Sequence, residues 1–434
     1  MRKLLLILIF TFPLFKIYGQ EKEDSLIQTK PFRNAEDLKT GAVQNYFFDI
    51  QEKQKEDSFK IFSEKLLNLL FASEIGKYVT DSKNLTLQKA YAVLSTADKQ
   101  LFLGTTVDFR KSDLERLRTL WTLGLKAKLS DDFSTLVKNS DPSGELGLNF
   151  KYTRIGSGTI KYTGNRDKIL SYRNEILKEK FQKKVEKYIQ SEYAQDRKAL
   201  ENLYLDSTYN KFNKKYLKLL EKKATEIYKG LAEEEIEVIK KEKLYRHFRD
   251  NWLTIEAFIP LTEKKYNLIP DTLNTKVGEE TFMPFNLKAG YTWFWHYANN
   301  KSLYLSGFGS IFNNNNIEIE KLKSFKLNTP VQGADNLIKK SQDVHAGNFE
   351  TFVTTNLKAE GICYFFWGGK AGLSVALEKN FGEYDATNWK LGLPVSLRDK
   401  DDKPTINFEA QWKEVNGDHF VGIGVGYSFG KFIN

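Results

Sequence analysis

The sequence predicts a mainly β fold, a transmembrane antiparallel β-barrel of about 12 strands, and three observations lead to this prediction. Apolar residues alternate with small or polar ones in segment after segment of about ten residues, the length that crosses a bilayer as a tilted strand. The amino terminus has the features of an export signal, and no later run is apolar enough for a spanning helix. A chain that enters a membrane without such helices has to cross it as a closed barrel, because lipid satisfies no backbone hydrogen bonds.

Residues 1–19 are predicted to be a cleavable signal peptide. Arg2 and Lys3 precede an apolar run, and the small residue Gly19 stands before Gln20. The alternative, a membrane anchor helix, is disfavoured because the run is shorter than the ~20 residues that a spanning helix needs and contains Pro13.

Residues 20–80 are polar and charged, with one short helical pattern that includes Phe62, Leu66, Leu67 and Leu70. We interpret this region as a partly helical lead-in on the periplasmic side.

The barrel strands are predicted in two blocks, residues 81–160 and 251–434. The first block holds strands one to four, at residues 85–94, 101–109, 120–129 and 145–153. The second holds strands five to twelve, at residues 253–261, 285–297, 303–312, 353–367, 371–380, 389–398, 406–413 and 420–432.

One face of these strands carries charges at every second position, which a dry protein core would not tolerate. In the eleventh strand, for example, Phe408 and Trp412 share one face, and Glu409 and Lys413 lie on the other. We therefore expect this second face to line a polar lumen. The lumen-lining candidates are Lys288, His296, Lys358, Glu360, Lys390 and Glu409.

Residues 161–250 are predicted to form a helical insertion between strands four and five. This region is rich in Lys and Glu and nearly free of Gly and Pro, and its apolar residues recur at helical spacing, with stripes at residues 169–189, 212–227 and 236–244. Its acidic run, which includes Glu233, Glu235 and Glu237, is expected to be a solvated face.

Loop lengths predict the orientation of the barrel. With the carboxyl terminus in the periplasm, the periplasmic connections 298–301, 368–369 and 399–404 are short, and the external connections 262–283 and 313–347 are long. The same alternation places the helical insertion in the periplasm. Aromatic residues near the strand ends are expected to form two membrane-interface girdles: Trp293, Trp295, Tyr297, Trp367, Trp389 and Trp412.

These features resemble bacterial outer-membrane β-barrel proteins in general, over roughly residues 85–155 and 250–434. The resemblance implies the bacterial outer membrane as location, with outer-membrane lipid and the barrel insertion machinery as partners. In that family the last strand carries the insertion signal, which Tyr427, Phe429 and Phe432 would supply here; the chain departs from the common pattern by ending in Ile433 and Asn434.

No catalytic residue, cofactor or metal ligand is predicted. Ser428 lies in a G-x-S-x-G match, but the match continues a strand, with no helix and no later His. The four histidines show no ligand spacing, and Cys363 falls on the lipid-facing set. The alternative of an external acid and His cluster stays open; its members would be Asp131, Asp132, Asp343, His345, Asp418 and His419.

The leading functional hypothesis is a non-enzymatic envelope anchoring or assembly component, whose residues 165–250 bind a periplasmic protein or peptidoglycan. The alternatives are a small-solute pore with the helices as plug or regulator, and an outer-membrane lipid hydrolase. The net charge of +10 comes without a basic recognition motif, so no nucleic-acid partner is expected.

Overall fold

The structure is a computed structural model. It describes residues 64–75, 85, 88–95, 100–110, 116–128, 137–138, 141–142, 146–162, 171, 178–195, 198, 222–223, 226–227, 230–269, 277–332, 337–398, 404–415 and 417–432. The predicted signal peptide, most of the lead-in, residues 172–177 and 212–221 of the predicted helical stripes, and the pair Asp131 and Asp132 lie outside these residues. The chain forms two compact units, residues 1–61 with 172–231, and residues 62–171 with 232–434.

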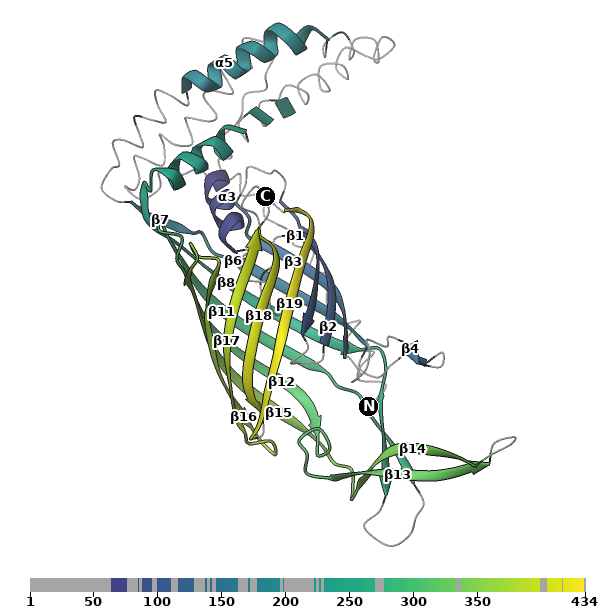
Figure 1. Ribbon diagram of the computed structural model, residues 1–434. Helices are drawn as coiled ribbons and strands as arrows, with labels where there is room; N and C mark the ends of the chain where they lie inside the picture. The colour runs from purple at the N-terminus through teal and green to yellow at the C-terminus, as the bar shows by residue number, and fades with distance from the viewer. Residues whose placement is uncertain are drawn as a thin grey trace, which may run out of the picture. The chain divides into compact units, whose positions relative to one another are not determined.

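The second unit contains a closed antiparallel β-barrel (Figure 1). Its main sheet has thirteen strands, and twelve of them form a ring because β19 pairs with β1 and β11 pairs with β8. The thirteenth, β7 (Thr159–Tyr162), pairs with β8 beyond the end of β6. The ring strands are β1 (Gln88–Ser95), β2 (Gln100–Asp108), β3 (Thr119–Lys128), β6 (Gly147–Ile155), β8 (Tyr245–Pro260), β11 (Asn286–Tyr297), β12 (Ser302–Asn315), β15 (Thr351–Phe366), β16 (Ala371–Phe381), β17 (Thr387–Arg398), β18 (Pro404–Val415) and β19 (Asp418–Phe432).

The predicted fold class is confirmed, since each of the twelve predicted strands corresponds to one ring strand. The largest difference in position is at β8, which begins at Tyr245, eight residues before the predicted start at Leu253. In this first part of β8 the inward residues Phe248 and Trp252 are apolar, whereas the outward Arg249 and Asn251 are polar. The alternation is therefore opposite to that of a lipid-facing strand, which is why the sequence pattern did not reveal it.

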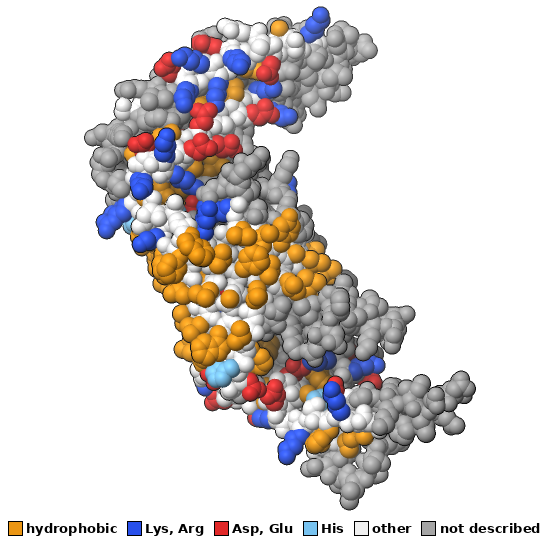
Figure 2. Space-filling model, viewed as in Figure 1, with side chains coloured by type: hydrophobic (Ala, Val, Ile, Leu, Met, Phe, Trp, Pro, Cys, Tyr) orange, Lys and Arg blue, Asp and Glu red, His pale blue; other side chains and the backbone are white. Residues whose placement is uncertain are grey.

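The outer surface of the barrel carries a belt of apolar side chains (Figure 2). Leu123, Leu287, Leu357 and Leu377 are exposed members of this belt, and their strand neighbours Thr122 and Asn356 are buried. A closed barrel with an apolar outer belt is the architecture of bacterial outer-membrane proteins, because lipid covers the belt and no sheet edge is left unpaired. Among the residues that the structure describes, no helix is both long and apolar enough to span a bilayer.

The two ends of the barrel differ in the length of their connections. At the end where β19 finishes, short connections join β11 to β12 and β15 to β16. At the other end, the long connections after β8 and β12 contain a separate four-stranded sheet in the order β10-β9-β14-β13. The sequence analysis treated these connections as loops and missed the sheet. Its strands are β9 (Lys264–Ile269), β10 (Gly278–Phe282), β13 (Lys323–Gln332) and β14 (Leu337–Ala346); a further two-stranded pair joins β4 (Val137–Lys138) to β5 (Asp141–Pro142).

The described part of the insertion between β7 and β8 is helical. Its elements in the first unit are α5 (Lys178–Tyr188) and the π-helix η2 (Ile189–Tyr193). Residues 230–241 are also helical and lead into β8. In this helix Glu233 and Glu237 are exposed, but Glu235 is buried next to Ile236 and Ile239, so the expectation of a solvated acidic face is wrong at Glu235.

Candidate functional site

The barrel contains a helix. This helix, α3 (Glu64–Ile75), belongs to the same compact unit as the ring strands and lies at the end of the barrel where β19 finishes (Figure 1). Its residues Leu66, Leu70, Phe71 and Ile75 are buried. The helical pattern was found in the sequence, but it was interpreted as a lead-in, whereas the structure docks the helix on the inner face of the wall.

Phe71 is the apolar centre of the docked helix. Its ring packs edge-on against Phe248, at 6.4 Å between ring centroids, and against Trp252, at 6.0 Å, both on the inner face of β8. The cluster continues through Phe294 on β11 and Tyr304 on β12, whose ring centroids are 4.8 Å apart. Buried aromatic groups of this size contribute strongly to packing, so these contacts hold α3 against three neighbouring strands.

A buried polar contact fixes the middle of α3. Asn68 accepts hydrogen bonds from the Arg116 guanidinium at 3.1 Å and from the backbone N–H of Leu117 at 2.8 Å. Arg116 also forms an ion pair with Asp250 on β8, and its guanidinium lies 5.1 Å from the centroid of the Phe71 ring. Because Arg116 and Asp250 are both buried, each depends on the other for charge compensation.

Glu74 links the end of α3 to the wall and to the helix at residues 230–241. One carboxylate oxygen lies 3.2 Å from Nδ1 of His296, and the other lies 2.9 Å from Nζ of Lys240. The Tyr304 hydroxyl donates to the backbone carbonyl of Glu74 at 3.1 Å. His296 also lies 3.0 Å from the Ser302 hydroxyl. One side chain of α3 therefore joins elements that are distant in sequence.

A second part of the inner wall is polar and charged. Lys390 on β17 lies between Glu360 on β15 and Glu409 on β18, with Nζ 2.8 Å and 3.4 Å from their carboxylate oxygens. Glu409 also accepts hydrogen bonds from Ser374 on β16 at 2.5 Å and from Gln411 at 2.8 Å. All five side chains are buried, so a paired polar network spans four adjacent strands.

The predicted lumen residues all lie on buried or half-buried positions of their strands. Glu360, Lys390 and Glu409 meet in the polar network, and Lys358 lies 4.0 Å from Glu360. His296 contacts α3 instead. Lys288 lies with Nζ 4.1 Å from the centroid of the Phe308 ring. That ring occupies the space above Gly290, where a Cβ atom would lie 2.1 Å from Phe308 Cδ1.

The predicted interface aromatics point mostly outward. Trp293, Tyr297, Trp367 and Trp412 are exposed, and Trp295 and Trp389 are half-buried. In the predicted insertion signal, Tyr427 is exposed on β19, and the backbones of Phe429 and Phe432 pair with Ala90 and Gln88 of β1. The last strand thus also closes the ring.

The sequence analysis missed Glu74, Arg116, Asp250 and Tyr304 as parts of one site. One feature of the sequence could have indicated that an apolar element packs inside the barrel. Phe294 is an apolar residue on the inward set of a strand whose other inward residues are polar or small, and such a residue needs an apolar partner inside the lumen.

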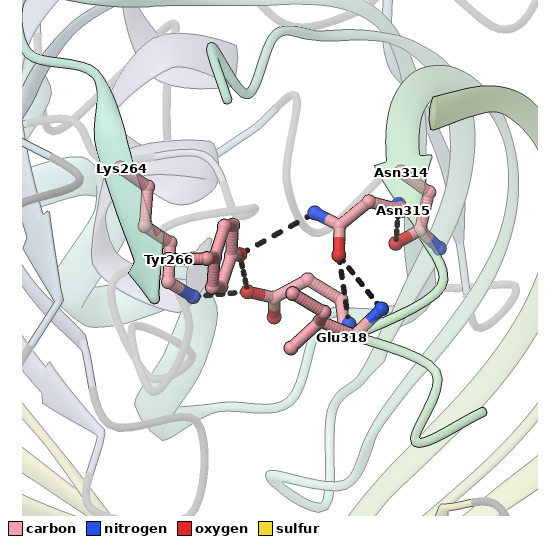
Figure 3. Close-up of polar contacts among 6 residues, drawn as sticks. Lys264, Tyr266, Asn314, Asn315 and Glu318 are labelled. Carbon is pink, nitrogen blue, oxygen red and sulfur yellow. Dashed lines mark hydrogen bonds and ion pairs between the residues drawn. The ribbon is translucent and has the colours of Figure 1, made fainter. Parts of the chain in front are cut away.

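At the opposite end, asparagines connect the barrel to the four-stranded sheet (Figure 3). Asn315 accepts hydrogen bonds from the backbone N–H groups of Ile317, at 3.0 Å, and Glu318, at 2.9 Å. Its amide donates to the Tyr266 hydroxyl at 3.3 Å, and Tyr266 and Lys264 both contact the Glu318 carboxylate. The run of asparagines seen in the sequence is thus a structural junction between β12 and β9.

Replacing Asn315 with Ala is expected to loosen this junction. The buried backbone N–H of Ile317 and the half-buried N–H of Glu318 lose their acceptor, which costs about 1–3 kcal/mol locally. Hydrogen exchange should accelerate at residues 264–269 and 316–320 but remain unchanged in the barrel strands. Asn328→Ala, at an exposed position of β13, is the control. Equal exchange in the two variants would contradict the role of Asn315.

The four-stranded sheet is expected to weaken as the pH falls. Burial lowers the pKa of His345, whose ring packs edge-on against Tyr266 at 6.0 Å between centroids, and Lys264 lowers it further, while Asp343 and Glu318 oppose the shift. The unfolded sheet therefore binds the proton more readily, so stability present above the ordinary pKa of 6.5 is lost as the pH falls below it.

Hydrogen exchange in β9 and β14, corrected for intrinsic rates, should therefore be faster at about pH 5 than at about pH 7.5. His345→Gln should remove this difference, whereas His419→Gln should keep it. If the difference between the two pH values persists in His345→Gln, another titrating group causes it.

Two described members of the proposed cluster of external acids and histidines lie close together, since Asp343 acts on the pKa of His345. His345 lies in β14 and contacts Tyr266, whereas His419 lies in β19 and contacts the rings of Trp389 and Trp412. Within the described residues, no group of three or more His, Cys, Asp or Glu side chains is arranged to hold a metal ion.

Comparisons with known proteins found similar structures but no sequence relative. No protein-family model and no curated protein matches the chain. The chain is similar to the KdgM porin in complex with disordered oligogalacturonate, with a TM-score of 0.27, 7% identity, and coverage of 78% of this chain and 97% of that one. It is also similar to the beta domain of the Bordetella autotransporter BrkA, with a TM-score of 0.24, 8% identity, and coverage of 78% and 96%. A mutant of the Rh. blastica porin gives a TM-score of 0.20, 7% identity, and coverage of 78% and 97%.

Proposed function

We propose that this protein is an outer-membrane channel for small polar solutes, and that α3 closes its lumen in the conformation described here. The observation behind the proposal is the docking of an apolar helix inside a barrel whose wall is elsewhere polar and charged. A permanently filled barrel gains little from buried ion pairs, because well-packed apolar residues of similar volume are often at least as stabilising. If α3 undocks, the wall becomes exposed to water and solute, and polar and charged side chains are then favourable there.

The charges of the wall suggest the class of solute. In the polar network two carboxylates face Lys390, with Lys358 nearby, so positive and negative groups are balanced. A balanced lining creates no strong field of one sign along the path. The proposed solutes are therefore small neutral or zwitterionic molecules, with weak discrimination between anions and cations.

Single-channel conductance in planar bilayers tests the proposal. The comparison is between the chain without its signal peptide, the same chain without residues 20–76, and a matched control without residues 172–229. We expect rare openings of the chain that lacks only its signal peptide and of the control that also lacks residues 172–229. We expect sustained conductance of the chain that lacks residues 20–76, because the lead-in and α3 are removed. The folded state of each barrel is checked by its heat-modifiable mobility in gels. A folded barrel that lacks residues 20–76 and still does not conduct would refute the channel.

A second candidate, envelope anchoring through the insertion, rests on α5. This helix, KEKFQKKVEKY, carries five Lys and two Glu residues, and its Tyr188 is buried. A basic helix of this kind suits an anionic polymer such as peptidoglycan. Co-sedimentation of the chain with purified peptidoglycan should then be lost on deletion of residues 172–229 and kept on deletion of residues 20–76. Equal sedimentation of both would exclude this role for α5.

A further inference from the structure

The outer surface of the barrel is basic at one rim. Exposed Lys and Arg side chains gather at the strand ends on the side where α3 lies, and we call this group the basic rim. On the face shown in Figure 2, such side chains border the apolar belt at this end. At the described ends of the strands themselves no Asp or Glu is exposed there, and Glu242, in the turn before β8, is exposed. The basic rim consists of Arg154, Lys161, Arg246, Arg249 and Lys301.

Strand pairing places the basic rim next to interfacial aromatics. Arg249 of β8 is the register partner of Trp295 on β11, and His247 is the partner of Tyr297. On the other side of β8, Lys161 of β7 pairs with His247. Tryptophan and tyrosine at barrel ends mark the depth of the lipid headgroups, so these cations lie at headgroup level.

The opposite rim does not share this property. There Lys379 forms an ion pair with Asp385, and Lys321 forms one with Glu383 at 3.6 Å. Lysines at that rim are thus matched by acids on the same surface. Among the described residues, the two ends of the barrel therefore differ in how closely their exposed cations are matched by acids.

We infer that the basic rim binds the anionic headgroups of glycerophospholipids in the leaflet around this end of the barrel. The phosphate diesters lie at the level of the guanidinium and ammonium groups, while the acyl chains cover the adjoining apolar belt. Each cation near a charged leaflet favours binding by about 1 kcal/mol, which corresponds to a preference of about fivefold. The inference holds whether the barrel is a channel or an anchor.

Lipid retention tests this inference. The chain without its signal peptide is refolded into vesicles with equal amounts of phosphatidylglycerol and phosphatidylcholine of the same acyl chains. It is extracted with mild detergent, and the bound lipids are quantified by native mass spectrometry. The test variant is Arg154→Gln/Lys161→Gln/Arg246→Gln. It leaves Arg249 in place, because this residue donates to the Thr159 hydroxyl at 2.7 Å. The control at the opposite end is Lys265→Gln/Lys321→Gln/Lys379→Gln, with the same change of net charge; each of these lysines forms an ion pair with an acid, Lys265 with Glu279 at 3.0 Å.

We expect the wild-type chain to retain phosphatidylglycerol preferentially, and the test variant to lose at least about tenfold of this preference. The control should stay within about twofold of wild type, because its lysines have acidic neighbours that already offset their charge. An unchanged preference in the test variant would overturn the inference, and so would an equal loss in the control, because it would reflect net charge alone. Only barrels that show folded mobility in gels are compared.

A salt titration gives an independent measurement on the wild-type chain. Electrostatic binding of headgroups should weaken steeply between about 0.01 M and 0.5 M NaCl, because the screening length becomes shorter than the spacing of the charges. A lipid preference that does not change with salt would also overturn the inference.

Discussion

Replacing Phe71 with Ala is expected to release α3 from the barrel wall and to raise the open probability of the channel about 100-fold. The Phe71 ring is fully buried against Phe248 and Trp252. Truncation of a buried Phe to Ala destabilises the packed state by about 3–5 kcal/mol. A change of about 2.7 kcal/mol is enough to shift the equilibrium between docked and undocked α3 by a factor of about 100. The cost falls on the docked state, because the ring has no such contacts after release. Single-channel recording in planar bilayers measures the change.

Leu69→Ala is the matched control for Phe71→Ala. Leu69 is an apolar residue of the same helix at a half-buried position, so this variant tests whether any truncation in α3 opens the barrel. Part of its side chain is accessible already in the docked state, so we expect a cost of only about 1 kcal/mol, or about fivefold in open probability. Hydrogen exchange of residues 64–75 reports independently on undocking. If Phe71→Ala frees the helix in exchange but the barrel stays silent, α3 does not gate the lumen.

Replacing Glu409 with Ala is expected to destabilise the barrel by about 3–5 kcal/mol. The substitution leaves Lys390 with one buried carboxylate instead of two, and it removes the acceptor of Ser374 and of Gln411. The penalty is large because none of these groups can reach bulk water without a change in the wall. Urea unfolding of the chain in vesicles, followed by tryptophan fluorescence, measures the loss.

Two further variants make the Glu409 experiment decisive. Glu409→Gln keeps the size and one acceptor, so we expect a smaller cost than for Ala. Glu383→Ala removes an acid from an exposed ion pair with Lys321, and such pairs contribute about 0–1 kcal/mol. If Glu409→Ala were as mild as Glu383→Ala, the polar wall would already be hydrated in this state. The closed lumen proposed here would then be wrong.

Much of the barrel could be predicted from the sequence because its determinants are local. Leu287 and Trp293 alternate with Lys288 and Thr292 along β11, and lipid on one side imposes the same pattern on every strand. The strand number, the approximate strand ends and the alternation of short and long connections all follow from that pattern. The four-stranded sheet was missed because it lies beyond the membrane, where no uniform solvent imposes an alternation.

The docking of α3 could not be predicted in the same way. The Tyr304 hydroxyl and the Glu74 carbonyl are 230 residues apart in sequence, and Arg116 and Asp250 are 134 residues apart. A helical pattern in α3 shows that one face will be buried, but not what will cover it. The apolar residues Phe248 and Trp252 of β8 even gave a misleading pattern, because their partner is a helix inside the barrel and not lipid.

The sequence by itself thus determined that this protein is a membrane-spanning β-barrel and which side of most strands faces lipid, since alternation is a property of neighbouring residues. Only the tertiary structure decided that α3 docks on the inner wall, that Glu360, Lys390 and Glu409 share one network, and that cations gather at one outer rim. These features depend on the closure and register of the ring, which bring residues from distant strands to the same height in the wall.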